Sequence, residues 1–221
     1  MTALIQMRSF VARYMIALLW LHVPLTAVAS LLLGQGFIVP TIGSAAFAAA
    51  ATAVWSFDRA GAASRQTTAV ALMLQISLLV YVFRGNPWQI DMHMYFFAAL
   101  AILAAFCDWR VIIAGTATVA VHHLVLNFLL PAAVFPGGAD LGRVVLHAII
   151  IVLEAAVLVW LSVRLSAALS DAEKAIETAE QTAADARRAD EEKRVSEQRA
   201  DIERRRILEE LANGFEASVS R

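Results

Sequence analysis

The chain has 221 residues, of which 60% are hydrophobic, and its formal net charge is −1. This composition is too apolar for a soluble domain of ordinary composition and indicates a membrane protein. The charged residues are distributed unevenly along the chain, although the net charge is nearly zero. Few of them precede Asp171, and the segment after it is densely charged. The single cysteine, Cys107, excludes an internal disulfide, and we interpret it as a small packing residue.

Six apolar stretches are long enough to cross a bilayer, for which a helix needs about 20 residues. The first three are predicted at about residues 10–33, 37–57 and 67–83. The fourth and fifth lie between Asp91 and Pro131 and are divided at Asp108-Trp109-Arg110, and the sixth covers about residues 143–163. The first stretch, long and without a clear cleavage site, is predicted to be a retained helix rather than a signal peptide.

The distribution of arginines between the short loops predicts the orientation. Arginines on one predicted side outnumber those on the other, which places both termini in the cytoplasm. The first set is Arg8, Arg13, Arg59, Arg65, Arg110 and Arg164, and the second is Arg84 and Arg143.

The sixth helix has no terminator and continues into a charged segment with small residues in steps of three and four. That spacing favours a weakly held, parallel dimeric coiled coil over a single solvated helix. The predicted seam is Leu165, Ala168, Ala172, Ala175, Ala179, Thr182, Ala186 and Ala189, and an apolar face returns at Ile207, Leu208, Leu211, Phe215 and Val219. We therefore expect an all-α fold: a six-helix transmembrane bundle in residues 1–165 and a cytoplasmic coiled-coil helix in residues 166–221, truncated before its output domain.

All five histidines lie in apolar segments: His22, His93, His122, His123 and His147. Ionisable residues inside a membrane are costly, so they indicate a functional site by default. The predicted helix boundaries place all five at mid-bilayer or in the outer half, contributed by four helices. His122 and His123 are about 100° apart on one helix and cannot both point squarely at one ligand.

Neutral imidazole binds haem iron, copper and zinc. Without a C-x-x-C-H motif a covalently attached haem is excluded, which leaves haem b, favoured here, with copper or zinc as the alternative. Asn127 shares a face with His123, and Glu154 shares a face with His147, so each is expected to support a histidine ring. Met92 and Met94 flank His93 and could add a soft ligand for copper or haem.

Other readings of the histidines stay open. They could only hydrogen-bond between helices, or they could form a proton relay with Glu154 in a transporter, although no inverted repeat is evident. A purely structural membrane anchor is the residual alternative. No phosphate loop, nucleophile elbow or hydrolase metal motif occurs, so we expect no enzymatic activity and no nucleic-acid partner.

Several motifs together resemble a known family: His-Val-Pro in the first helix, DMHMYFFAALAILAAFCDWR, the HHL doublet with a following Asn, and the last helix's His-to-Glu spacing. The chain resembles the six-helix membrane sensory region of some bacterial methyl-accepting chemotaxis receptors and diguanylate cyclases. Its tail, ILEELANGFEASVSR, is similar to the start of a chemoreceptor signalling domain. Relatives often have a second histidine at the position of Met94.

The resemblance implies a sensor in the bacterial inner membrane, surrounded by lipid, which signals to downstream chemotaxis proteins. Together with the histidines, it predicts a redox or gas sensor whose five histidines hold one or two haem b groups or a metal ion. A change at that group would shift the last helix and the dimeric coil attached to it.

Overall fold

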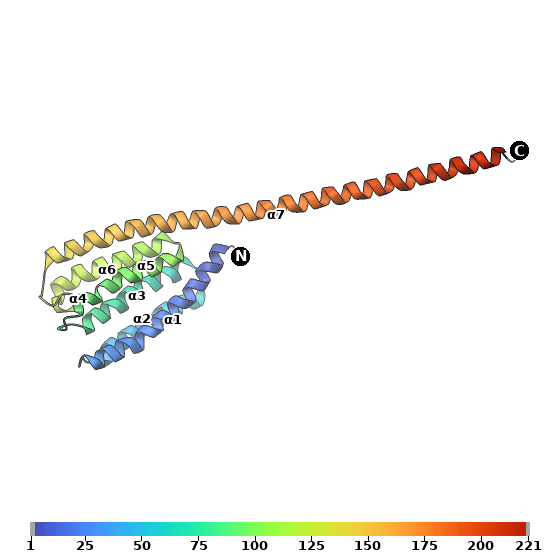
Figure 1. The fold of residues 1–221 in the computed structure, drawn as a ribbon. Helices are drawn as coiled ribbons and strands as arrows, with labels where there is room; N and C mark the ends of the chain where they lie inside the picture. The colour runs from blue at the N-terminus through green and yellow to red at the C-terminus, as the bar shows by residue number, and fades with distance from the viewer. Residues whose placement is uncertain (1–2, 220–221) are drawn as a thin grey trace. The chain divides into compact units, whose positions relative to one another are not determined.

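The computed structural model describes residues 3–219, with side chains described as far as Asn213, and this range contains helices and no strand. The chain divides into two units, Met1–Ser170 and Asp171–Arg221 (Figure 1). The first is a helical bundle and the second is a single helical segment. The predicted all-α fold, with six long apolar helices of which the last is extended, is confirmed. The division falls at Ser170 rather than at residue 165.

The helices follow the predicted order along the chain. Their bounds are α1 (Ala3–Leu32), α2 (Ile38–Phe57), α3 (Ala62–Val82), α4 (Gln89–Met92), α5 (Met94–Leu103), η1 (Ala104–Phe106), α6 (Trp109–Leu129), η2 (Pro131–Ala133) and α7 (Leu141–Val219). Six helical stretches are long and apolar enough to cross a membrane, and α4, α5 and η1 together count as one of them, Gln89–Phe106. The structure therefore supports a multi-pass membrane protein.

Helix α3 lies at the centre of the bundle, where it packs closely against α1, α2, α5 and α6. It has the lowest mean hydropathy of the six crossings, 1.3, and yet the largest buried share. The other helices shield its polar residues from lipid. Gln75, for example, donates from Nε2 to the carbonyl oxygens of Leu19 and Ser44, both at 2.9 Å, and thereby ties α1 and α2 to α3.

One end of the bundle is held by a buried ion pair. Arg65 on α3 donates to Oδ2 of Asp108 from Nη2 at 2.6 Å and from Nε at 3.1 Å. Asp108 also caps α6, because its Oδ1 accepts from the backbone N–H of Arg110 at 3.1 Å. Arg8 on α1 donates to the carbonyl oxygens of Phe106 and Cys107 at 3.1 and 2.8 Å. We call these side chains, Arg8, Arg65 and Asp108, the arginine cluster.

Cys107 forms the turn between η1 and α6 in a left-handed conformation, with φ of 48°. Its side chain is buried, and burial raises the pKa of its thiol. A buried thiol with a raised pKa is inert, which agrees with the predicted packing role.

The helices of the bundle differ in how tightly they pack. At Gly115 of α6, a Cβ would come within 3.0 Å of Leu100 on α5, so glycine allows these two helices to approach closely. Within the described chain, α7 is absent from the helix pairs whose backbones pack closely. Only a few of its side chains, such as Ile151 and Ala155, reach the core. The last helix is therefore the most loosely held in the bundle.

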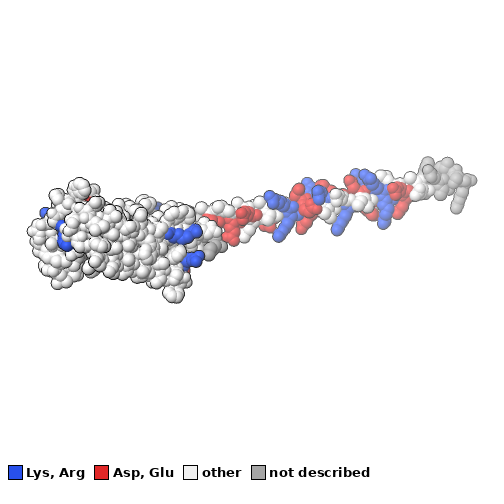
Figure 2. Space-filling view, turned by 90° about the horizontal axis from the view of Figure 1, so that it is seen from below, with Lys and Arg blue, Asp and Glu red and all other residues white. Residues whose placement is uncertain are grey.

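The second unit is a continuous helix that carries side chains of both charges along the face seen in Figure 2, whereas the basic residues seen on the bundle lie toward its two ends. Ion pairs three or four residues apart, such as Arg194–Glu191 at 3.0 Å, line its surface. Apolar residues at Ile207, Leu208 and Leu211 are exposed in the single chain. The predicted dimeric coil stays a prediction, and the side chains of Phe215 and Val219 lie outside the described part.

Candidate functional site

Four of the five histidines gather at the end of the bundle opposite the arginine cluster. His93 comes from the junction of α4 and α5, His122 and His123 from α6, and His147 from the second turn of α7. His93, His122 and His123 are only 4 to 8% exposed, and His147 is half-buried. His22, on α1, is buried elsewhere, against Tyr95.

His93, His123 and His147 contact one another, and we call these three the histidine cluster. Their ring centroids are 5.4 Å apart for His93 and His123, 5.7 Å for His93 and His147, and 5.6 Å for His123 and His147. Three helical segments far apart in the sequence thus contribute one imidazole each. The three rings therefore lie at the same level along the bundle and face one another.

Each ring of the histidine cluster is bound to its own helix in the same way. The Nδ1 atom of His93 lies 2.9 Å from the Gln89 carbonyl oxygen, that of His123 lies 2.9 Å from Val119, and that of His147 lies 2.8 Å from Arg143. A carbonyl oxygen can only accept, so Nδ1 carries the hydrogen and Nε2 keeps its lone pair. This is the tautomer in which a histidine binds a metal through Nε2.

The Nε2 atoms are left without partners. Those of His93 and His123 are buried and make no hydrogen bond. An unpaired buried polar atom costs about 1–3 kcal/mol, so such atoms need an explanation in a native structure. A bound ligand would provide one.

The histidine cluster lines a cavity of about 250 Å³ between α5, α6 and α7. Apart from the three imidazoles, its lining is apolar. The lining side chains include Phe97, Ala120, Leu124, Val144, Ala148 and Ile151. The cavity lies where α7 is loosely packed, and its chemistry is that of a few nitrogen donors in an apolar shell.

His93 sits at an irregularity in its helix. Its N–H bonds to the carbonyl of Ile90 at 3.1 Å, and its carbonyl accepts from Phe96 at 3.1 Å, both three residues away. Such a local tightening within a helix often marks a functional hinge. The regular α-helical hydrogen-bond pattern is therefore interrupted at His93, the first histidine of the cluster.

His122 contacts His123, with ring centroids 5.0 Å apart, but it does not line the cavity of the histidine cluster. It lines a separate groove between α3 and α6, with Val70, Leu74 and Val121. Its Nδ1 lies 3.3 Å from Nδ1 of His123, whose hydrogen is directed to Val119. That contact is favourable only if His122 Nδ1 accepts, which places the hydrogen of His122 on Nε2, an atom that is also buried and unpaired. Because His122 does not line the cavity, we leave it out of the histidine cluster.

The sequence predicts His22 as a ligand together with the other histidines, but the structure places it elsewhere, on α1. Its Nδ1 lies 2.8 Å from the Leu18 carbonyl oxygen, and its Nε2 accepts from the Tyr95 hydroxyl at 2.8 Å. Both ring nitrogens are therefore paired, and no further lone pair is left for a ligand. Its role in this structure is to join α1 to α5.

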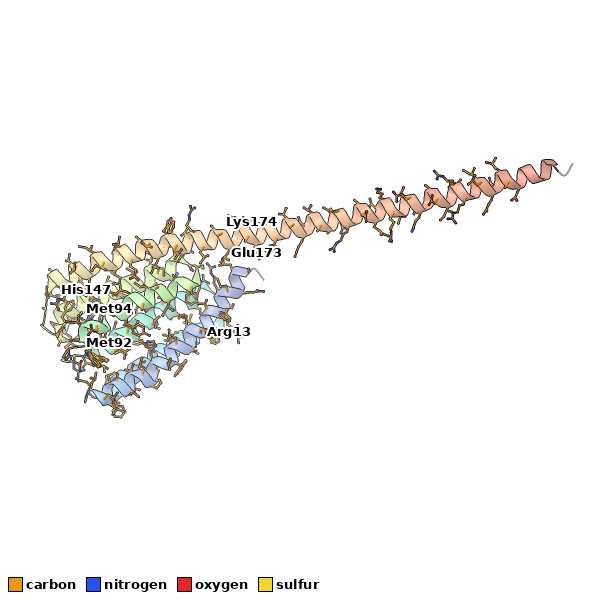
Figure 3. The ribbon with its side chains drawn as sticks, in the orientation of Figure 1. Arg13, Met92, Met94, His147, Glu173 and Lys174 are labelled. Carbon is orange, nitrogen blue, oxygen red and sulfur yellow. The ribbon has the colours of Figure 1, made fainter. Side chains whose placement is uncertain are left out.

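The predicted supporting residues do not line the cavity. Asn127 has a different partner from the one expected, because its Oδ1 accepts from the backbone N–H of Asp140 at 2.8 Å and so holds the start of α7. Glu154 Oε2 is buried, and no hydrogen bond joins it to a histidine in the described chain. Met94 is 68% exposed, and Met92 packs against the core. Figure 3 shows both methionines at the same end of the bundle as His147.

Phe135, which sequence reasoning missed, covers the site. The loop between α6 and α7 folds inward and stacks Phe135 on His93, with centroids 5.8 Å apart and planes 8° apart. Gln89 donates to the Ala132 carbonyl at 2.9 Å and ties this loop to α4. Phe96 adds an edge contact to His123 at 5.5 Å. A run of prolines and glycines signals a loop in a sequence but not its inward fold.

Among the described residues, no group of three or more His, Cys, Asp or Glu side chains converges closely enough to hold a metal ion. The rings of the histidine cluster are neighbours, but their donors do not meet at one point. No protein-family model, curated protein or solved structure matches this chain.

Proposed function

We propose that this protein is a membrane sensor that binds a transition-metal ion, copper or zinc, through His93, His123 and His147. The observation that carries the proposal is the set of three buried or half-buried imidazoles, each with Nδ1 bonded to its own helix and Nε2 available. Neutral imidazole suits zinc and copper, and bundle cores are common places for such sites.

The spacing of the rings supports a single ion. Zinc or copper bound to imidazole nitrogens at about 2.0–2.1 Å holds neighbouring rings in van der Waals contact, as these rings already are. Since the donors do not yet converge, binding would require rotation of the rings or a shift of α7 toward α5 and α6. The loose packing of α7 makes that shift the easier of the two.

Haem b, favoured by the sequence alone, is the competing ligand and fits this cavity less well. Cavities that bury drug-sized organic ligands measure about 300–1,000 Å³, whereas the cavity here measures about 250 Å³. Two histidines that ligate one haem must also lie on opposite faces of the macrocycle, and the rings here are in mutual contact. If haem were bound, His93, His123 and His147 would be the candidate ligands of its iron, and it would supply redox or gas-binding chemistry.

The proposed signal is a displacement of α7. His147 lies in its second turn, and the helix runs without a break from Leu141 to Val219. A ligand shifts a two-state equilibrium only through contacts that differ between the states, and an ion held by His147 and the two bundle histidines provides such a difference. The output is a chemoreceptor-type signalling coil, in a dimer of the bacterial inner membrane with both termini cytoplasmic.

The test is an absorption spectrum of the purified protein, oxidised and then reduced with dithionite, together with elemental analysis of the same sample. We expect no Soret band and about one copper or zinc per chain after expression with both metals and a haem precursor. A Soret band with sharp bands after reduction would show that haem b, and not copper or zinc, is the ligand. Absence of both haem and metal would overturn it.

A further inference from the structure

A second candidate site lies at the opposite end of the bundle. A groove of about 400 Å³ runs between the start of α6 and the segment of α7 that ends at Ser170. Its lining combines basic, hydroxyl and aromatic side chains: Arg8, Arg110, Ser162, Ser166, Ser170 and Trp109. We propose that this groove binds the phosphate of an anionic phospholipid headgroup.

The charge of the groove favours an anion. Asp108 also lines it, but that carboxylate is already paired with Arg65, with Nη2 at 2.6 Å from Oδ2. Burial alone would raise the pKa of Asp108, but hydrogen bonds from Arg65 and from the N–H of Arg110, together with the charges of Arg65 and Arg8, outweigh burial and lower it. Arg8 and Arg110 then leave the groove with an excess of positive charge.

The two arginines have donors to offer. Arg8 uses Nε and Nη2 for the carbonyl oxygens of Phe106 and Cys107, which holds its guanidinium in place. A guanidinium has five N–H donors in a fixed fork that matches phosphate, so Nη1 is left over. Arg110 is exposed and lies over the ring of Trp109, with its guanidinium carbon 5.0 Å from the ring centroid.

A buried hydroxyl provides an independent observation. Ser162 lines the groove at 1% exposure, and its Oγ has no hydrogen-bond partner. Helical hydroxyls usually bond back to the carbonyl four residues earlier, as Thr118 does to Ala114 at 2.8 Å. Ser162 does not, so its donor is available to a phosphate oxygen.

The surroundings favour a lipid over a soluble anion. Trp109 is an amphipathic ring at the end of a crossing, as in the aromatic belt of membrane proteins. Basic pockets between transmembrane helices on the cytoplasmic side bind anionic lipid headgroups, and this is the end that the arginine distribution predicts to be cytoplasmic. A lipid here would contact α7 at the far end of its crossing from His147.

The test is native mass spectrometry of the full detergent-purified chain, titrated with phosphatidylglycerol or with phosphatidylcholine of the same acyl chains. We expect preferential retention of phosphatidylglycerol. Loss of two charge-assisted contacts in Arg8→Gln/Arg110→Gln should weaken it about tenfold. The matched control, Arg13→Gln/Arg59→Gln, removes the same charge outside the groove and should retain the lipid within about twofold.

Ser162→Leu narrows the groove without a change of charge and leaves the bonds of Arg8 intact, so it tests the proposal even if the double arginine variant misfolds. It should also lose the lipid. Wild-type retention in Ser162→Leu, or an equal loss in the matched control, would overturn the proposal. Displacement of the lipid by millimolar inorganic phosphate would overturn the lipid assignment in favour of a soluble phosphate.

Discussion

The two ends of the bundle differ in how their buried charged and imidazole groups are paired. In the arginine cluster, the charges of Arg65 and Asp108 are paired and their hydrogen bonds join α3 to the start of α6. In the histidine cluster, each ring has one satisfied nitrogen, and the Nε2 atoms of His93 and His123 are buried and unpaired. Paired groups hold helices together, whereas unpaired groups cost free energy until a ligand satisfies them. The comparison separates an end that the ion pair stabilises, called here the structural end although the proposed lipid groove also lies there, from an end with unpaired imidazole nitrogens, called here the binding end.

The largest expected effect is on the structural end. Asp108→Asn leaves the Arg65 charge buried and unpaired, which should destabilise the fold by about 3–5 kcal/mol. Thermal unfolding in detergent, followed by circular dichroism, measures the loss. Asp91→Asn, at an exposed aspartate of α4, is the control and should leave the melting temperature unchanged. Equal shifts in the two variants would erase the distinction between the ends.

Protonation of Asp108 should also lower the stability of the fold at acid pH. Because the pKa of Asp108 is lowered in the folded state, its contribution is complete above the unfolded value of 3.8 and is lost as pH falls through the lower folded value. Wild-type stability should therefore decline in that acid range, and Asp108→Asn should lack this component. Unfolding curves at a series of acid pH values compare the two proteins, and parallel curves would contradict the assignment.

At the binding end, His123→Ala should leave the metal-free fold intact and abolish tight metal binding. The affinity should fall by more than about 100-fold, since loss of a mere supporting partner already costs 10–100-fold. Calorimetric titration with zinc or copper measures it. His122→Ala is the matched control from the same helix turn, and its affinity should stay close to that of the wild type. If His122→Ala were the damaging variant, the tautomers assigned here would be reversed.

The smallest change in stability is expected from a substitution at the contact between Tyr95 and His22. Tyr95→Phe removes the hydroxyl that donates to His22 Nε2 at 2.8 Å, which should cost about 1 kcal/mol of stability. Metal affinity should not change, because His22 is outside the histidine cluster. A strong loss of metal affinity in Tyr95→Phe would contradict this placement, because His22 would then belong to the metal site.

The level of a side chain along its helix could be predicted from the sequence, but the direction in which it points around the helix axis could not. The approximate bounds of the crossings, and the shared level of His93, His123 and His147 along the bundle, follow from the hydropathy pattern and the loop residues. Helices that are apolar on every side carry no signal for which face meets which neighbour. That is why His22 was grouped with rings that it does not contact, and why Asn127 was assigned to His123 instead of to the Asp140 N–H.

The long-range contacts of the loops could not be predicted from the sequence either. Phe135 covers the histidine cluster because the loop before α7 folds inward and is held by Gln89. Proline and glycine between residues 131 and 138 indicate a turn, but they do not indicate where its aromatic residue packs. The small residues of α6 were similarly ambiguous, and at Gly115 they serve close packing against Leu100.

The most direct test of the central claim is X-ray absorption spectroscopy at the zinc and copper edges of the purified protein. We predict imidazole nitrogens at about 2.0–2.1 Å from one metal, with about three rings in the wild type and no bound metal in His93→Ala/His123→Ala/His147→Ala. The same imidazole signal in that triple variant would contradict the account, because the metal would then be held elsewhere.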